Sequence, residues 1–364
     1  MDFQLTEEQS LIKSSASEIA NDLAGLSAKE ALQVLADIDF LGIFFPEEYG
    51  GAGGDFLSYF VALKEFAHVS ASAALGYAVH CTQAGYTIWK YGTKSAKENY
   101  LQALCSGQMI GSYAHDEGWI GRDVALIETK AEKDAAGFRI TGQKTFVYNG
   151  RESDLLIIFA NTEKGLSAFV VESDLPGVKI SEPYRKMGLD LISEHTVDFD
   201  KVYVPAENLL GEEGEGQIIA KCIFDVNSIS LSAIAEGITH CAIEKAIAYG
   251  KERKQFNRPI IFFDGLSEKL GKMIVDLEAS ELLTEKAVQS LTNGEDIAEQ
   301  AYAARYFALK AGEQICVDAI QLHGGYGYSK DLGVESLLRD IKGLSVFETL
   351  TKPMILSIAA EAVL

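Results

Sequence analysis

The first hundred residues space their apolar side chains with the period of an α-helix. Thr6 precedes the first such segment and Gln9 stands three residues later, which is the spacing of a capping box at a helix start. Four glycines among residues 50–54 interrupt the pattern and predict a loop. Apolar residues return at helical spacing afterwards, at Phe60, Leu63, Phe66, Tyr86, Ile88 and Tyr91. The pattern predicts a helical domain over residues 1–108.

Between residues 109 and 215 the period changes from that of a helix to that of a strand. The sequence Asp134-Ala135-Ala136-Gly137 precedes the alternating residues 138–141 and predicts a hairpin turn. The apolar runs 155–160 and 168–171 are typical of largely buried strands, and residues 195–204 alternate as a further strand. Several short strands separated by turns predict a small β-barrel domain.

Helical spacing returns from residue 216 to the end, at residue 364. Segments 266–291 and 297–322 carry apolar residues on one face and charges between them. Long amphipathic helices with short connections predict an antiparallel four-helix bundle. The chain is therefore expected to be an α+β protein with an all-α domain (1–108), a β domain (109–215) and a helical bundle (216–364).

Composition narrows the classes of function. The 32 basic and 53 acidic residues give a net charge of −21, which argues against a nucleic-acid partner and against an anionic membrane surface. A phosphate-bearing cofactor stays compatible, because a few local cations suffice to bind it. The N-terminus has no signal-peptide pattern and no run of 18 apolar residues occurs. Five cysteines without CxxC spacing indicate free thiols in a reducing cytoplasm.

The six histidines and five cysteines follow no known metal-ligand spacing. No HExxH motif and no pair of closely spaced cysteines occurs. We therefore expect no metal site.

Two segments of the C-terminal domain carry candidate phosphate contacts. Residues 253–259 read Arg-Lys-Gln-Phe-Asn-Arg-Pro, and residues 321–327 read Gln-Leu-His-Gly-Gly-Tyr-Gly. Arginine forks suit phosphate oxygens, and glycines let a backbone approach a ligand closely. Each segment also has a purely structural interpretation: basic residues offset a helix C-terminal dipole, and glycines end a helix in a tight turn.

Two further segments carry candidate chemistry. Phe146 and Tyr148 lie on one face of a strand within Gly142–Gly150, where aromatic side chains either join the core or wall a planar cofactor. Glu348 follows the apolar-rich stretch that ends in Phe347. This carboxylate is either a solvated helix residue or a buried base with a raised pKa.

Together, and in this order, these segments resemble the acyl-CoA dehydrogenase family over essentially the whole chain. Residues 253–259 are similar to the family's R-x-Q-F-G-x-P signature, with Asn257 in place of the glycine, and Gln321–Gly327 is similar to its Q-x-x-G-G-x-G signature. Three other matching segments are Leu5–Gln9, Phe45–Gly51 and Val204–Gly211.

The resemblance implies FAD, bound between the β domain and the bundle. It implies that Arg253 and Phe256 reach the FAD of a neighbouring subunit in a homodimer or homotetramer. Gln321, Gly324 and Gly325 would contact the same cofactor, and Phe146 and Tyr148 would lie along the flavin ring.

The reaction that the resemblance implies is α,β-dehydrogenation of an acyl thioester on coenzyme A or a carrier protein. Glu348 would remove the α-proton, while its backbone N–H and a ribityl hydroxyl of FAD polarise the thioester carbonyl. The β-hydrogen would leave as hydride to flavin N5. An electron-transfer flavoprotein is the expected partner for reoxidation.

Several residues depart from the family pattern around the flavin and the thioester. Asp116 replaces a threonine that faces the flavin, Arg122 replaces a serine that meets the pantetheine arm, and Ser228 replaces an arginine. With Asn227 and Phe347, these are the candidate substrate residues. The departures favour an altered substrate, such as a carrier-bound acyl group. The alternatives are a flavin oxidase or monooxygenase on the same fold and a non-catalytic scaffold.

Overall fold

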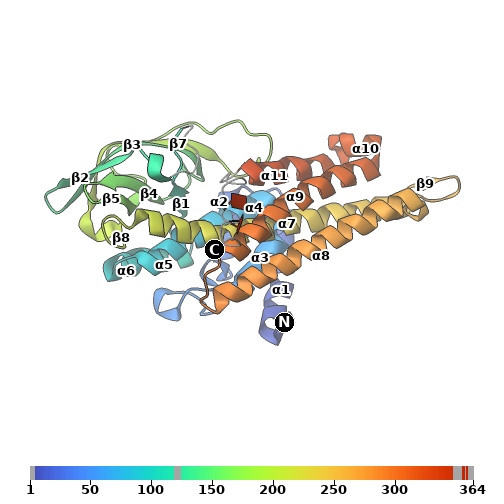
Figure 1. The fold of residues 1–364 in the computed structure, drawn as a ribbon, viewed down its shortest axis with the longest axis horizontal. Helices are drawn as coiled ribbons and strands as arrows, with labels where there is room; N and C mark the ends of the chain where they lie inside the picture. The colour runs from blue at the N-terminus through green and yellow to red at the C-terminus, as the bar shows by residue number, and fades with distance from the viewer. Residues whose placement is uncertain (1–4, 119–123, 347–354, 357, 360–364) are drawn as a thin grey trace.

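In the computed structural model, one helical region precedes a β-sheet along the chain and another follows it, and the sheet lies at one end of the molecule (Figure 1). The structure describes residues 5–118, 124–346, 355–356 and 358–359. The N-terminal helices are α1 (Glu7–Ala20), α2 (Ala28–Ala36), α3 (Phe56–Val69), α4 (Ala71–Ala78), α5 (Tyr86–Tyr91) and α6 (Lys94–Cys105). Thr6 and Gln9 form the predicted capping box at α1. The order of helices, sheet and helices confirms the predicted fold class, while the domain boundaries stay a prediction.

A π-helix over Val79–Gly85 joins α4 to α5 and connects the helical region to the sheet. The ring of His80 accepts a hydrogen bond at Nδ1 from the Gly111 amide, at 3.1 Å, and Nε2 lies 3.1 Å from the carbonyl oxygen of Leu104. Burial lowers the pKa of His80 to about 4. The ring is therefore neutral at pH 7, with the proton on Nε2, and it ties the end of α6 to the first strand.

The middle region is a single sheet of eight strands. The strands are β1 (Gly111–Ala114), β2 (Lys130–Asp134), β3 (Gly137–Tyr148), β4 (Leu155–Thr162), β5 (Gly165–Glu172), β6 (Val178–Ile180), β7 (Glu194–Pro205) and β8 (Leu209–Leu210). Their order is β6-β7-β3-β2-β4-β5-β8, with β1 parallel to β4. Asp134 pairs with Gly137 in the predicted β2–β3 hairpin, where Ala135 takes a positive φ of 47°.

Strand β4 is buried on both faces, which explains its continuous apolar sequence. Leu155, Ile157 and Phe159 pack against side chains of α6 and of the long helix α7 (Gly216–Glu252). Leu156 and Ile158 point to the other face and join the apolar interior of the sheet. Successive strand residues point to opposite faces, so one strand serves two cores.

The C-terminal region is a helical bundle with a small hairpin at its far end (Figure 1). Its helices are α7 (Gly216–Glu252), α8 (Asp264–Thr292), α9 (Ala298–His323), α10 (Gly325–Tyr328) and α11 (Val334–Val346), and its hairpin strands are β9 (Lys254–Gln255) and β10 (Arg258–Pro259). Helix α7 is long and apolar enough to cross a membrane, with a mean hydropathy of 1.5 in its most apolar window. However, 78% of that window is buried within the fold, as expected of the central helix of a bundle.

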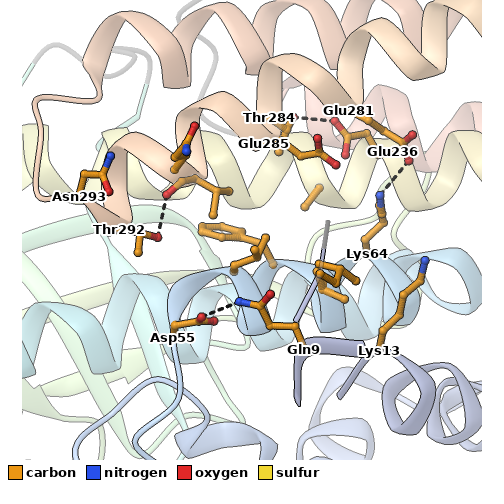
Figure 2. Close-up of a pocket in the computed structure, with 17 residues that line it drawn as sticks. Gln9, Lys13, Asp55, Lys64, Glu236, Glu281, Thr284, Glu285, Thr292 and Asn293 are labelled. Atoms are coloured by element: carbon orange, nitrogen blue, oxygen red, sulfur yellow. Dashed lines mark hydrogen bonds and ion pairs between the residues drawn. The ribbon is translucent and has the colours of Figure 1, made fainter. Parts of the chain in front are cut away.

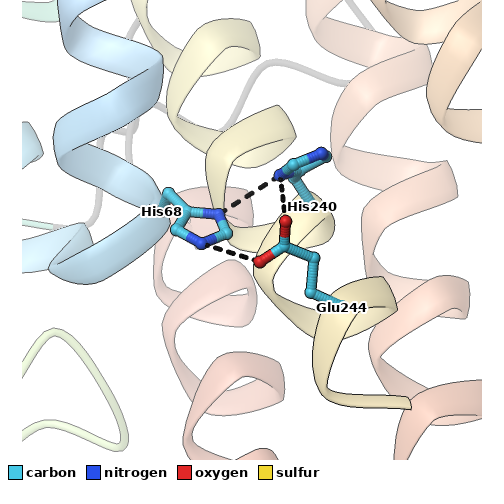
Figure 3. Close-up of side chains that lie close together, drawn as sticks. All are labelled: His68, His240 and Glu244. Atoms are coloured by element: carbon cyan, nitrogen blue, oxygen red, sulfur yellow. Dashed lines mark hydrogen bonds and ion pairs between the residues drawn. The ribbon is translucent and has the colours of Figure 1, made fainter. Parts of the chain in front are cut away.

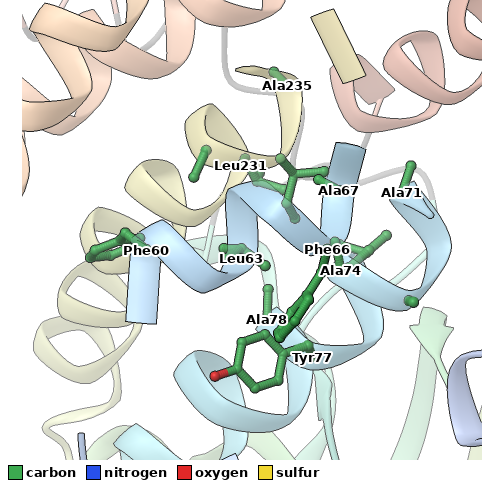
Figure 4. Packing of buried hydrophobic residues seen from close by; sticks show 14 of the residues in the cluster. Phe60, Leu63, Phe66, Ala67, Ala71, Ala74, Tyr77, Ala78, Leu231 and Ala235 are labelled. Atoms are coloured by element: carbon green, nitrogen blue, oxygen red, sulfur yellow. The ribbon is translucent and has the colours of Figure 1, made fainter. Parts of the chain in front are cut away.

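Helix α7 packs closely against α3 (Figure 4). Phe60, Leu63 and Phe66 of α3 join a core that includes Leu231 and Ala235 of α7. Gly237 marks the tightest approach, because a Cβ there would stand 2.4 Å from the Lys64 carbonyl oxygen and 2.6 Å from the Ala67 Cβ. The missing side chain at Gly237 therefore allows the two helices to touch along their backbones.

We expect Gly237→Val to lower the free energy of unfolding by about 1–3 kcal/mol, because added carbons in a closed contact force helices apart. Gly271 of α8 serves as the control, since no atom lies within 4 Å of its Cβ position. Gly271→Ala should be neutral or raise stability by about 0.5–1 kcal/mol through helix propensity. Thermal denaturation followed by circular dichroism measures both. Equal melting temperatures for Gly237→Val and the parent would show that the contact is not tight.

Candidate active site

The end of β3 presents Phe146 outward at a bulge. The pairing with β7 shifts register between Lys144 and Val147, and Phe146 takes a positive φ of 55°. Its ring is 45% exposed and lies 5.6 Å from the ring of Tyr184. Tyr148, two residues further, is buried in the apolar core. Of the two predicted flavin-side aromatics, Phe146 offers a face to a ligand and Tyr148 supports the strand from behind.

The loop that carries Asp116 is fastened to β3 by its backbone and by a buried ion pair. The carbonyl oxygen of Asp116 accepts a hydrogen bond from the Thr145 amide at 2.8 Å. The Glu117 carboxylate lies 2.5 Å from the buried ammonium group of Lys144. Burial lowers the pKa of Lys144 to about 8, and Glu117 opposes this shift. The ion pair therefore fixes the loop where the family pattern places a flavin-facing residue.

Glu194 is a buried carboxyl that no sequence motif pointed to. It stands directly opposite Tyr148 in the ladder between β3 and β7 and is 7% exposed. Burial raises its pKa to about 7, and Asp116 adds to the shift, while Lys186 and His195 oppose it. The cross-strand register alone reveals this position, because the neighbouring residues carry no signal for it.

The two candidate substrate residues on α7 are completely buried. Asn227 and Ser228 stand among the fully buried polar residues of the chain. The Ser228 hydroxyl donates a hydrogen bond to the carbonyl oxygen of Phe224 at 2.8 Å, one turn earlier in the helix. Ser228 thus satisfies its donor within α7, and it offers no cation where the family pattern has an arginine.

At the opposite end of the bundle, two distant sequence motifs form one pocket. Arg253, Gln321, Gly324 and Gly325 line a depression of about 480 Å³. Gly324 has φ 58° and ψ −135°, a conformation that glycine adopts readily, and no atom lies within 4 Å of a Cβ at Gly324 or Gly325. An arginine fork beside open glycine backbone suits phosphate oxygens. These residues therefore fit part of a dinucleotide such as FAD.

The β9–β10 hairpin carries Phe256 at its tip. Phe256 is 89% exposed, and both turn residues have positive φ, 49° for Phe256 and 61° for Asn257. Such a turn favours glycine or asparagine at its second position. This explains why Asn257 can replace the glycine of the family signature without changing the turn. The hairpin lies at the far end of the long axis from the sheet (Figure 1).

Three predicted residues, Arg122, Phe347 and Glu348, lie outside the described residues. Helix α11, which ends at Val346, is anchored to the segment that precedes β7. Asp340 accepts a hydrogen bond from the Leu189 amide at 2.6 Å, and Arg339 donates one to the Met187 carbonyl oxygen at 2.8 Å. The same segment contains Tyr184, which touches Phe146. Residues 339–340 of α11 are thereby tied to the same segment that contacts Phe146.

A cavity of about 520 Å³ lies elsewhere, among α1, α3, α7 and α8 (Figure 2). Lys64 and Glu281 form an ion pair of 2.8 Å within it, and the buried Glu236 accepts hydrogen bonds from Ser280 and Thr284. Among the described residues, none of the predicted cofactor or substrate residues lines this cavity. Its ion pair and its hydrogen bonds to Glu236 join neighbouring helices, so packing accounts for them and they give no support to a catalytic role.

Family models match the three regions in chain order. The model described as "Acyl-CoA dehydrogenase, N-terminal domain" matches residues 6–108, the middle-domain model matches 113–202, and the C-terminal-domain model matches 214–363. A short-chain specific acyl-CoA dehydrogenase of Clostridium acetobutylicum is 35% identical over 363 residues, covering 96% of both chains. The chain belongs to the acyl-CoA dehydrogenase family. It is therefore a flavin oxidoreductase of the type that acts on CH–CH bonds.

Solved structures agree with this assignment. Butyryl-CoA dehydrogenase from Megasphaera elsdenii superposes with a TM-score of 0.97 at 32% identity, with all of both chains covered. The prolyl acyl carrier protein oxidase AnaB superposes with a TM-score of 0.95 at 28% identity, covering 99% of this chain and 100% of the other. Members of the acyl-CoA dehydrogenase fold thus include a dehydrogenase and an oxidase at comparable structural similarity to this chain.

Because the pKa of Glu194 is raised, the free energy of unfolding should depend on pH in a predictable way. The folded-state pKa of about 7 lies above the ordinary value of 4.5, so the contribution of Glu194 to stability is complete below about pH 4.5 and is lost as the pH rises through 7. Glu194→Gln should therefore gain stability relative to the parent between pH 5 and pH 8, by on the order of 2 kcal/mol. Thermal unfolding at both pH values, with Asp198→Asn on the exposed side of β7 as control, measures the difference. A pH-independent difference between Glu194→Gln and the parent would contradict the raised pKa.

Proposed function

We propose that the chain catalyses α,β-dehydrogenation of an acyl thioester with FAD as its cofactor. The observation that carries the proposal is the gathering of Arg253 with Gln321, Gly324 and Gly325 in one pocket. These residues come from two motifs far apart in the sequence, and the family pattern assigns both motifs to the same cofactor. A second support is Phe146, whose exposed ring stands where that pattern has a flavin-side aromatic.

The side chains have distinct roles in this proposal. Glu348 accepts the α-proton of the thioester, and its backbone N–H donates a hydrogen bond to the thioester carbonyl oxygen. Arg253 and the amides of Gly324 and Gly325 bind phosphate oxygens, and Phe146 lies along the flavin ring. When bound, FAD supplies the acceptor for the hydride that leaves the β-carbon. The half-buried Asp116 and the buried Glu194 add acidic groups on the same side of the sheet.

Glu348→Gln tests the base directly. The variant should keep FAD and fold, but lose flavin reduction by substrate by roughly 10²–10⁴-fold, because glutamine cannot accept the proton. Anaerobic stopped-flow absorbance with a panel of acyl-CoA and acyl-carrier thioesters measures the rate.

The matched control for Glu348→Gln is Glu313→Gln. Glu313 forms a surface ion pair of 2.9 Å with Lys342 of α11, and exposed pairs contribute little to stability. The flavin of the Glu313→Gln variant should be reduced by substrate at the parent rate. If Glu348→Gln also reduces within about threefold of the parent, a far smaller loss than a missing general base causes, Glu348 is not the base.

The positions of the cofactor residues support a dimer or a larger homo-oligomer. Phe146 belongs to the sheet, whereas Arg253 and Phe256 belong to the opposite end of the bundle (Figure 1). One FAD molecule can use both sets if the sheet of one subunit meets the bundle end of another. The exposed Phe256 ring would then be covered by the neighbouring subunit, as apolar interface residues usually are.

Subunit complementation tests this arrangement. Arg253→Ala should weaken FAD binding by about 10–100-fold, because a charged hydrogen bond to phosphate is lost. When Arg253→Ala and Glu348→Gln subunits are unfolded, mixed and refolded together, each mixed dimer should contain one intact site, formed by Glu348 of one subunit and Arg253 of the other. Activity measured at an FAD concentration that saturates the parent but not Arg253→Ala should recover well above that of either variant alone. Mixing without any recovery would mean that both residues serve the same subunit's site.

A flavin oxidase is the second candidate function. The likeness to the prolyl acyl carrier protein oxidase AnaB favours it. An electron-transfer flavoprotein would reoxidise a dehydrogenase, whereas dioxygen would reoxidise an oxidase. Mixing the substrate-reduced enzyme with air separates the two: slow reoxidation supports the dehydrogenase, and rapid release of peroxide supports the oxidase.

A further inference from the structure

His68, His240 and Glu244 form a cluster where α3 ends against α7 (Figure 3). The Nε2 atom of His68 lies 3.2 Å from a Glu244 carboxylate oxygen, and its Nδ1 atom lies 3.3 Å from Nδ1 of His240. The other Glu244 oxygen lies 3.7 Å from Nδ1 of His240. One donor atom from each residue can be chosen so that all three lie within 4.8 Å of one another. The two histidines are 172 residues apart in sequence, which is why no ligand spacing revealed them.

The helix packing explains why these side chains meet. Gly237, His240 and Glu244 follow one another at spacings of three and four residues, so they share a face of α7. Gly237 brings α3 so close that its Cβ position stands 2.9 Å from the His68 amide nitrogen. The backbone contact at Gly237 therefore sets the His68 side chain beside the next turn of α7. Both helices are continuous elements, so the positions of the three Cα atoms are fixed before any ligand binds.

We propose that this cluster binds a divalent transition-metal ion of the zinc class. Two imidazole nitrogens and one carboxylate oxygen are ligands that Zn²⁺, Cu²⁺ and Ni²⁺ share. In a tetrahedral site with donors about 2.0–2.1 Å from zinc, neighbouring donors are about 3.3 Å apart. If His68 binds through Nδ1, its distance to Nδ1 of His240 is 3.3 Å, and that nitrogen of His240 lies 3.7 Å from a Glu244 oxygen. His68 contributes one of its two ring nitrogens, and a rotation of its partly exposed side chain completes the set without movement of either helix.

The ion would join the N-terminal helical region to the bundle. His240 and Glu244 side chains are about half exposed, at 52% and 56%, so water completes the coordination sphere. None of the three residues belongs to the cofactor or substrate sets described above. The expected consequence of binding is therefore higher thermal stability of the α3–α7 contact, since an ion that binds only the folded protein stabilises it.

Few other side chains compete for such an ion. All six histidines fall within the part of the chain that the structure describes, and the other four, His80, His115, His195 and His323, are buried. Cys241 follows His240 in the sequence and is a free, partly buried cysteine that does not belong to the cluster. A Cys241→Ser variant therefore serves as the matched control on the same turn of α7.

Metal titration of the purified holoenzyme tests the site. Isothermal titration with ZnCl₂ should show one saturable site per chain, with MgCl₂ giving none, and Zn²⁺ should raise the melting temperature. His68→Ala and His240→Ala should each weaken binding at least tenfold, Glu244→Gln should weaken it less, and Cys241→Ser should bind as the parent does. With Cu²⁺, the electron paramagnetic resonance spectrum should show coupling to two nitrogens, falling to one in either histidine variant.

Three results would overturn the site. The first is zinc binding that persists unchanged in the His68→Ala/His240→Ala double variant. The second is the absence of saturable binding up to about 0.1 mM zinc in the parent, where an affinity worth a measurable stabilisation would be saturated. The third is a copper spectrum without nitrogen coupling. Circular dichroism without metal checks that every variant is folded. If a histidine variant does not fold, weaker zinc binding by Glu244→Gln still tests the site.

Discussion

Close contact between α7 and α3 is the constraint on which most of the molecule depends. Helix α7 runs through the bundle, contributes Ile219 and Ile223 to the core beneath the sheet, and is capped by Arg253, which lines the pocket at the far end of the bundle. At Gly237, α7 lies so close to α3 that a Cβ atom would stand 2.4 Å from the Lys64 carbonyl oxygen, so no side chain fits there. Because one rigid helix spans all three places, the sheet and the far pocket keep a fixed separation within a subunit.

In the proposed function, that separation divides the cofactor contacts between two subunits. The sheet end offers Phe146 with acidic neighbours, and the bundle end offers an arginine fork and open glycine backbone. In the proposed arrangement, oligomerisation is a condition of cofactor binding and not an added layer of regulation, because a second copy supplies the other set of contacts. The exposed aromatic tip of the hairpin is consistent with this division.

Local sequence rules predicted the elements whose signals are local. The capping box at Thr6, the hairpin at Asp134–Gly137 and the doubly buried strand β4 each follow from a few neighbouring residues. Long-range register was not readable: the bulge that turns Phe146 outward and the pairing of Glu194 with Tyr148 depend on how two strands meet. The same limit hid His68 and His240. Family motifs pointed to the candidate cofactor residues. The replacement of the signature's glycine by Asn257 is explained only by the positive φ at that position.

The π-helix at Val79–Gly85 has a consequence for how this part of the chain can vary. A π-turn holds one more residue than an α-turn, so the segment stores a single-residue insertion inside an otherwise continuous helix. The stored residue rotates the second half of that helix, letting α4 face the helical core while His80 and α5 face the sheet. Deleting one residue here would leave a regular helix with its second half turned by about 100°. Lineages that lengthen or shorten this helix must therefore compensate in the strand that His80 holds.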